Sequence, residues 1–259
     1  MNLLPTISSE WLKFRSVRST VYTLAVTIFL CVGIGALACF AERQQWPQEG
    51  LAKRALFDPV RQSLFGFFFA EIAIGVIGVL IISSEYSSGS IRTTLAATPR
   101  RLSVLLSKAC VLFASTLVVG EASSFVSFFI GQSILRSTEP ATLSTPGALR
   151  AVFLGGLSLA LLALLAMGFA TMLRHTAGAI TVYVSVQLVL LLIVSALPSS
   201  WSDRVLKYLP EILTQSMRAS HLKGAQFTSF SPWVSTLVLA AYAVAALIGG
   251  GWLLLRRDA

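Results

Sequence analysis

Six long apolar runs constrain the fold of this chain more than any other feature of its sequence. A helix that crosses the hydrocarbon core of a bilayer needs about 20 mostly apolar residues, and each run provides that length. Strand-like alternation of apolar and polar residues, which a membrane β-barrel requires, is absent from the runs. We therefore predict an all-α polytopic membrane protein in which residues 1–259 form one transmembrane domain. The predicted spans lie at about 21–40, 62–83, 102–135, 151–173, 177–198 and 231–255.

The composition excludes two other classes of protein. Hydrophobic residues make up 55% of the chain and charged residues 12%. Charged residues make up about 25% of an average soluble domain, so this chain lacks the polar surface of a soluble enzyme. A disordered chain requires low hydrophobicity, so that class is excluded as well.

The net charge of +9 indicates membrane orientation rather than nucleic-acid binding, because basic residues concentrate in the cytoplasmic segments of membrane proteins. If both termini are cytoplasmic, the short segments on that side hold ten basic and three acidic residues. The other side holds ten basic and six acidic residues, which are spread over longer loops. We therefore expect both termini in the cytoplasm and no nucleic-acid partner.

The segment before the first run has the pattern of a helix that lies on the membrane surface. Trp11 and Phe14 share one face of a helix predicted over residues 6–18, and Glu10 suits its positive end. Tryptophan prefers the headgroup zone, and arginine binds lipid phosphates. A plain basic flank of the first span is the alternative. The residues of the predicted interfacial helix are Glu10, Trp11, Phe14, Arg15 and Arg18.

The segment between the second and third runs, residues 84–101, is longer than a connector needs to be. It begins with Glu85 and continues through small hydroxyl residues and Gly89. A predicted helical stretch then ends before Pro99, because the residue before a proline disfavours the α conformation. A structured polar loop with few charges is suited to docking another protein.

The order of residues in this loop resembles that of the permease subunits of ABC-2-type exporters. Those proteins carry Glu, then Gly-Thr, Leu, Pro, Arg and a downstream Lys. The resemblance extends to the amphipathic start, the six spans and the long loop before the last span, and the opening from Ser9 to Ser16 is similar to that of actinobacterial members. The matching residues here are Glu85, Gly89, Ser90 in place of Thr, Leu95, Pro99, Arg100 and Lys108.

The resemblance implies that the loop forms a coupling helix that docks into a separate ATPase subunit. On this basis, Arg92 reaches acidic groups on the ATPase, and Glu85 caps or pairs with the interfacial helix. The alternative is that the charged residues are only solvated loop ends. The implied coupling residues are Glu85, Ser88, Gly89, Ser90, Ile91, Arg92, Leu95, Pro99, Arg100 and Arg101.

The resemblance also implies the partners and the location of the protein. A second permease subunit, either an identical chain or a close homologue, and two ATPase subunits are expected in a bacterial plasma membrane. ATP and Mg²⁺ are expected on the ATPase subunits, because this chain has no G-x-x-x-x-G-K-[ST] phosphate-binding loop. His175 and His221 lack metal-ligand spacing. We therefore expect no catalytic residue, no metal site and no enzymatic activity in this chain itself.

Two acidic residues, Glu71 and Glu121, lie inside predicted spans. Charged groups at such depth are costly, so each is expected to face the interior of the bundle or a water-filled cavity. One interpretation is a cargo path or dimer interface that favours cationic or donor-rich cargo. The other is a protonated carboxyl group that is hydrogen-bonded between helices.

Three functions therefore remain open from the sequence. The first is the permease half of an ABC exporter. The second is an ATP-independent transporter or channel with Glu71 and Glu121 as a relay, and the third is a membrane scaffold without transport. The segment 199–230 is expected either to re-enter the membrane or to lie on its outer surface.

Overall fold

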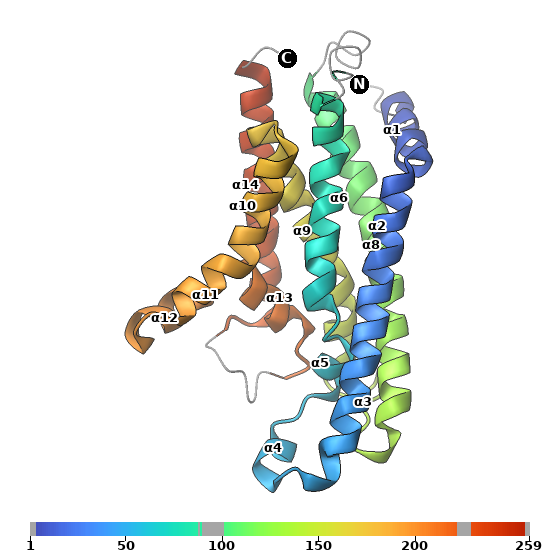
Figure 1. Cartoon of the computed structure of the whole chain (residues 1–259), viewed down its shortest axis with the longest axis vertical. Helices are drawn as coiled ribbons and strands as arrows, with labels where there is room; N and C mark the ends of the chain where they lie inside the picture. Colours follow the sequence, from blue (N-terminus) through green and yellow to red (C-terminus); the bar gives the residue numbers. More distant parts are fainter. Residues whose placement is uncertain (1–3, 88, 90–100, 222–228, 257–259) are drawn as a thin grey trace.

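The computed structural model describes residues 4–87, 89, 101–221 and 229–256, and all regular elements in these ranges are helices. Figure 1 shows an elongated bundle in which α1 (Leu4–Ser16) and the last turns of α14 (Pro232–Arg256) lie at the same end. Six helical segments within the described ranges are long and apolar enough to cross a membrane. The predicted all-α fold with six spans is confirmed.

The six spans correspond to the six apolar runs. The first joins α2 (Arg18–Phe29), a π-helical turn at Leu30–Ile34 and α3 (Gly35–Gln45). The second, third and fourth spans are α6 (Phe67–Ser87), α8 (Arg101–Ile134) and α9 (Ala148–Leu173). The fifth span begins with α10 (Thr176–Val184) and continues through a π-helical turn at Ser185–Val189 into α11 (Leu190–Ser195). The sixth is α14. The short helices are α4 (Leu51–Ala55), α5 (Pro59–Ser63), α12 (Ser199–Leu206) and α13 (Pro210–Arg218).

The second span begins at Phe67 rather than at the predicted residue 62, because the chain breaks between α5 and α6. Asp58 caps α5, where its carboxylate accepts hydrogen bonds from two backbone N–H groups. At the break, a Cβ atom on Gly66 would lie 2.2 Å from the carbonyl oxygen of Leu30. The break therefore lets the backbone of the second span approach the π-helical turn of the first.

The central helix of the bundle is α9, which packs against α6, α8 and α14. Small residues allow these helices to approach closely, as is common between helices in membranes. A Cβ atom on Gly78 of α6 would lie 2.2 Å from the carbonyl oxygen of Ala163, and one on Gly168 would lie 2.5 Å from Cβ of Ala246 on α14. Side chains larger than glycine therefore do not fit at these two crossings.

The segment before the last span holds two helices in different surroundings. α13 is buried and packs against α9 and α14. α12 carries the exposed Trp201 and follows α11, and Figure 1 shows both diverging from the bundle. Within the segment 199–230, α13 is therefore held inside the bundle, and residues 222–228 lie outside the described part of the chain.

Candidate functional site

Lys108 is a buried lysine on α8 that contacts two acidic residues from two other helices. Its Nζ donates hydrogen bonds to Glu10 Oε2 of α1 at 2.6 Å and to Glu85 Oε1 of α6 at 2.7 Å. Lys108 is only 1% exposed and Glu10 4%. Removing an ammonium group from water costs several kcal/mol, which close carboxylate partners offset. Glu10 and Glu85 therefore compensate the charge of Lys108 in its buried position.

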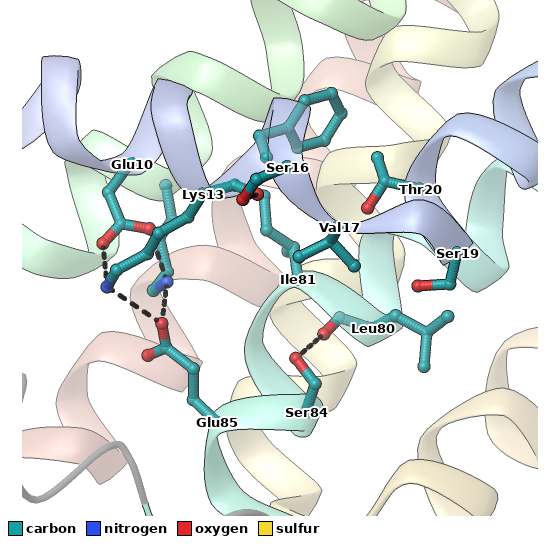
Figure 2. A pocket seen from close by; sticks show the side chains of 12 residues that line it. Glu10, Lys13, Ser16, Val17, Ser19, Thr20, Leu80, Ile81, Ser84 and Glu85 are labelled. Carbon is teal, nitrogen blue, oxygen red and sulfur yellow. Dashed lines mark hydrogen bonds and ion pairs between the residues drawn. The ribbon is translucent and has the colours of Figure 1, made fainter.

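Lys13 completes a group of four charges that we name the Lys108 cluster: Glu10, Lys13, Glu85 and Lys108. Lys13 Nζ lies 3.0 Å from Glu10 Oε1 and 3.3 Å from Glu85 Oε1. Figure 2 shows its side chain reaching toward both carboxylates. Burial lowers the pKa of Lys13, but its hydrogen bonds and attraction to Glu10 and Glu85 outweigh burial and raise the pKa. The cluster contains two acids and two bases and is therefore balanced in charge.

The local sequence explains how α1 presents this cluster. Glu10 and Lys13 are three residues apart and so share one face of the helix. Phe14, on the same side, is 7% exposed, whereas Trp11 is 46% exposed and stacks on Phe14 with ring centroids 6.4 Å apart. Val17 has an extended backbone (φ −81°, ψ 112°) and separates α1 from α2. One face of α1 therefore packs on α8 and reaches α6 through the Lys13–Glu85 ion pair, while the other face remains exposed.

A cavity of about 370 Å³ lies beside the cluster, between α1, the start of α2 and the end of α6. Ser16 and Thr20 line it on one side, and Leu80 and Ser84 line it on the other (Figure 2). This space lies next to the ion pairs at the junction of the three helices. The side chains at the junction therefore have room to move.

The structure places most residues of the predicted interfacial helix in α1, which begins by Leu4 and ends at Ser16 rather than at residue 18. Arg15 and Arg18 are exposed, and Arg18 is the first residue of α2. Glu10 differs from its expected role at the positive helix end, because α1 begins earlier and places Glu10 in its middle. Its carboxylate instead binds Lys108 and Lys13.

The predicted coupling loop lies mostly outside the described part of the chain. Within it, Glu85 is in the last turn of α6, and Gly89 has φ 71°, a left-handed conformation that glycine adopts readily. Arg101 starts α8. The predicted coupling residues that lie outside the described ranges are Ser88, Ser90, Ile91, Arg92, Leu95, Pro99 and Arg100.

Glu71 occupies a second buried group of charges near the start of α6. Its carboxylate forms an ion pair with Arg218 at the end of α13. Arg218 Nη2 also lies 3.8 Å from Glu211 Oε1 on the same helix. Gln187 donates a hydrogen bond to Glu71 Oε2 at 3.4 Å. We name Glu71, Gln187, Glu211 and Arg218 the Glu71 cluster; its single arginine is shared between two acids.

Arg218 was not among the site residues predicted from the sequence, because residues 199–230 could either re-enter the membrane or lie on its outer surface. The available signal was the strongly amphipathic pattern of α13, which ends in an arginine, together with a buried acid that needs a cation. Gln187 lies in the π-helical turn of the fifth span, and such turns are frequent at functional sites. The π-helical turn of the first span packs against α6 as well.

Glu121, the other acid inside a span, has different neighbours. It lies on α8 against α9, where a Cβ atom on Gly156 would be 2.6 Å from the Glu121 carboxyl carbon. Among the described residues, neither carboxylate oxygen has a hydrogen-bond partner. The structure therefore does not join Glu121 to the Glu71 cluster through any described interaction.

In the described ranges, no three His, Cys, Asp or Glu residues lie close enough together to hold a metal ion. His175, one of the two histidines, instead caps α10: its Nδ1 accepts a hydrogen bond from the Gly178 N–H at 3.2 Å.

Comparison with known families identifies the chain. The family model described as ABC-2 family transporter protein matches residues 6–200, which include α1, the first five spans and the Lys108 cluster. A comparison with curated proteins gave no match. Members of the matched family are transporter permeases rather than enzymes, and they typically work with an ATPase partner. Because the match covers more than half of the chain and six apolar helices accompany it, the chain belongs to the ABC-2 family of transporter proteins, as a multi-pass permease component of an ABC transporter.

Proposed function

We propose that this chain is the transmembrane permease subunit of an ATP-driven exporter in a bacterial plasma membrane. Two copies, or this chain and a close homologue, form the cargo path between them, surrounded by membrane lipid. Two separate ATPase subunits bind ATP and Mg²⁺ and dock on residues 84–101. Both termini of the permease lie on the same side as the ATPase subunits.

The Lys108 cluster is the observation that carries this proposal. Glu85 lies three residues before Ser88, the first residue of the proposed docking stretch. Its carboxylate binds Lys108 at the start of the next span, and Glu10 links the same lysine to α1. The beginning and the end of the docking loop are therefore connected to each other and to the amphipathic helix by buried ion pairs.

This arrangement gives a physical route from the ATPase to the membrane. When the ATPase subunits close, the docked loop moves with them, and the ion pairs of the Lys108 cluster draw α1, α6 and α8 along. Rigid-body movement of packed elements is a common form of such transmission. The far end of α6 carries Glu71, which holds α13 through Arg218, so the movement reaches the other side of the membrane.

An ATP-independent relay through Glu71 and Glu121 has less support. Glu71 is already paired with Arg218, and Glu121 packs on α9 without a described link to it. A relay needs a continuous series of groups that exchange protons or cations. A scaffold without transport gives no reason for burying Lys108 at the junction with the loop.

Co-purification tests the proposal directly. Tagged protein from native membranes, extracted in mild detergent, should bring down an ATPase with vanadate-sensitive activity. Arg92→Glu in the docking stretch should lose the ATPase, because it reverses the charge expected to contact acidic groups. Arg43→Glu, a matched change at an exposed position on α3, should retain it. If the unaltered protein brings down no ATPase, the proposal is wrong.

A further inference from the structure

A cavity of about 430 Å³ lies between α5, the start of α6, α11 and α13, at the opposite end of α6 from the Lys108 cluster. We name it the Arg61 pocket; its wall includes Arg61, Phe65, Phe68, Phe69, Glu211 and Arg218. We propose that the Arg61 pocket binds an amphiphile with one anionic group, a carboxylate or a phosphate, which Arg61 recognises while the phenylalanine rings hold the apolar part.

Arg61 provides a positive charge that the described residues do not neutralise directly. Its side chain is half-buried and donates a hydrogen bond to Gln215 Oε1 at 3.3 Å. Within the described ranges, no carboxylate lies within ion-pair distance of it. Burial lowers the pKa of the Arg61 guanidinium and the neighbouring Arg218 lowers it further, and together they outweigh the opposing attraction of Asp58 and Glu211. An incoming anion relieves both effects and finds a planar donor group suited to two parallel hydrogen bonds.

The other charges on the pocket wall are already engaged. Arg218 pairs with Glu71, so these two compensate each other. Glu211 accepts a hydrogen bond from Gln215 Nε2 at 2.9 Å, and burial followed by the nearby Glu71 raises the pKa of Glu211 well above its usual value. Glu211 attracts the charge of Arg61, but it forms no ion pair with it, and its Oε1 already faces Gln215 and Arg218. The pocket therefore favours an anion over a cation.

The aromatic part of the wall indicates the rest of the ligand. Phe65 is 50% exposed and Phe69 38% exposed, although both are large apolar residues. Their rings pack edge-on with centroids 6.3 Å apart, and Phe68 packs on Phe69 at 5.1 Å. Exposed apolar surface beside a half-buried cation suits an amphiphilic molecule, because its tail covers the rings while its head reaches the guanidinium.

The pairing of Glu71 also changes the expectation for cargo. The sequence alone suggested that Glu71 favours cationic cargo, but Arg218 occupies that carboxylate. The charge accessible from the pocket is that of Arg61. The inference goes beyond the proposed function, because equilibrium binding in the pocket requires no ATPase and can be tested whether or not an ATPase co-purifies.

The test uses the full-length protein in phosphatidylcholine nanodiscs and the fluorescent probe dansyl-undecanoic acid, with its methyl ester as the uncharged control. The acid should bind saturably, and at least about tenfold more tightly than the ester, because hydrogen bonds to charged groups are strong. Arg61→Gln should weaken binding of the acid about tenfold and leave the ester unchanged. Arg61→Lys should retain part of the affinity, and Arg43→Gln, which removes the same charge outside the pocket, should have no effect. Thermal unfolding verifies that each variant is folded.

Nanodiscs that contain phosphatidylglycerol distinguish the two sources of the anion. Competition by this lipid assigns the pocket to a membrane lipid headgroup, and no competition assigns it to cargo. The inference is wrong if acid and ester bind equally, or if Arg61→Gln and Arg43→Gln act alike. It is also wrong if the acid binds the single chain but not the assembled complex, because a second subunit then fills the pocket.

Discussion

Glu71 and Glu85 lie near opposite ends of α6, 14 residues apart in the chain, which is about 21 Å along the helix axis. Each forms an ion pair with a base from another helix, Arg218 of α13 or Lys108 of α8. Their surroundings differ. The Glu71 carboxylate is 1% exposed and the Arg218 side chain 5%, whereas Glu85 is 12% exposed and its second partner Lys13 is 48% exposed.

This difference indicates two mechanical roles for the two clusters. Both clusters border a cavity, but the Lys108 cluster has two bases for two acids and is partly exposed, so its bonds can exchange partners while the charges remain paired. The Glu71 cluster has one arginine for two acids in a buried environment, so separating it leaves an uncompensated charge. We therefore interpret the Lys108 cluster as a flexible contact between helices, the joint, and the Glu71 cluster as a rigid contact, the anchor.

The largest expected loss of stability comes from breaking the ion pair of the Glu71 cluster. Arg218→Met leaves Glu71 buried without its cation and should lower the free energy of unfolding by about 3–5 kcal/mol. The measurement is unfolding by sodium dodecyl sulfate in mixed micelles. The double variant with Glu71→Gln should recover much of the loss, because no buried charge then remains unpaired. A loss of less than about 1 kcal/mol for the single variant would contradict the role as an anchor.

Breaking the ion pairs of the Lys108 cluster should lower the free energy of unfolding by a smaller amount. Lys108→Met should lower the free energy of unfolding by about 2–3 kcal/mol, because Lys13 continues to compensate one of the two acids. In the assembled complex, ATP hydrolysis should continue while transport falls, since α1 no longer follows the loop. Lys53→Met, at an exposed lysine of α4, is the control and should change stability by less than about 0.5 kcal/mol. Equal losses in the two variants would show that Lys108 has no special role.

Removing one acid of the Lys108 cluster should lower the free energy of unfolding by less again. Glu85→Gln should cost about 1–2 kcal/mol, because Lys108 keeps Glu10. A double-mutant cycle with Lys108→Met should give a coupling energy above about 0.5 kcal/mol. If the two losses are simply additive, the contact between these side chains does not contribute to stability.

The smallest expected effect concerns pH. Because the pKa of Lys13 is raised in the folded protein, its contribution is complete below its unfolded pKa of about 10.4 and disappears as the pH rises through the folded value. Stability should therefore fall on the alkaline side more in the unaltered protein than in Lys13→Gln. The difference should be below about 1 kcal/mol, because the side chain is largely solvated. Unfolding titrations from neutral to strongly alkaline pH measure it, and identical curves for the two proteins would exclude a contribution from Lys13.

The number and type of the spans were predictable because apolar length alone determines whether a segment can cross a bilayer. The break before Phe67 was not predictable, because residues 62–70 contain neither a charged residue nor a proline that would mark it. Only the contact of Gly66 with the first span explains it.

The partners of the charged residues were harder to predict than the residues themselves. Glu10 and Lys108 are 98 positions apart, and Glu71 and Arg218 are 147 apart. A single sequence gives the cost of a buried charge but not which distant base compensates it. The resemblance suggested that Glu85 meets the amphipathic helix, but it did not suggest that a buried lysine of α8 lies between them.

The close crossings of α9 have a consequence for permeation. At Gly78 and Gly168, the backbones of α6, α9 and α14 approach so closely that a single methyl group does not fit between them. A molecule large enough to need a transporter cannot pass through these seams. Under the proposed function, the route of the cargo therefore avoids these two crossings, which agrees with a path formed between two permease subunits.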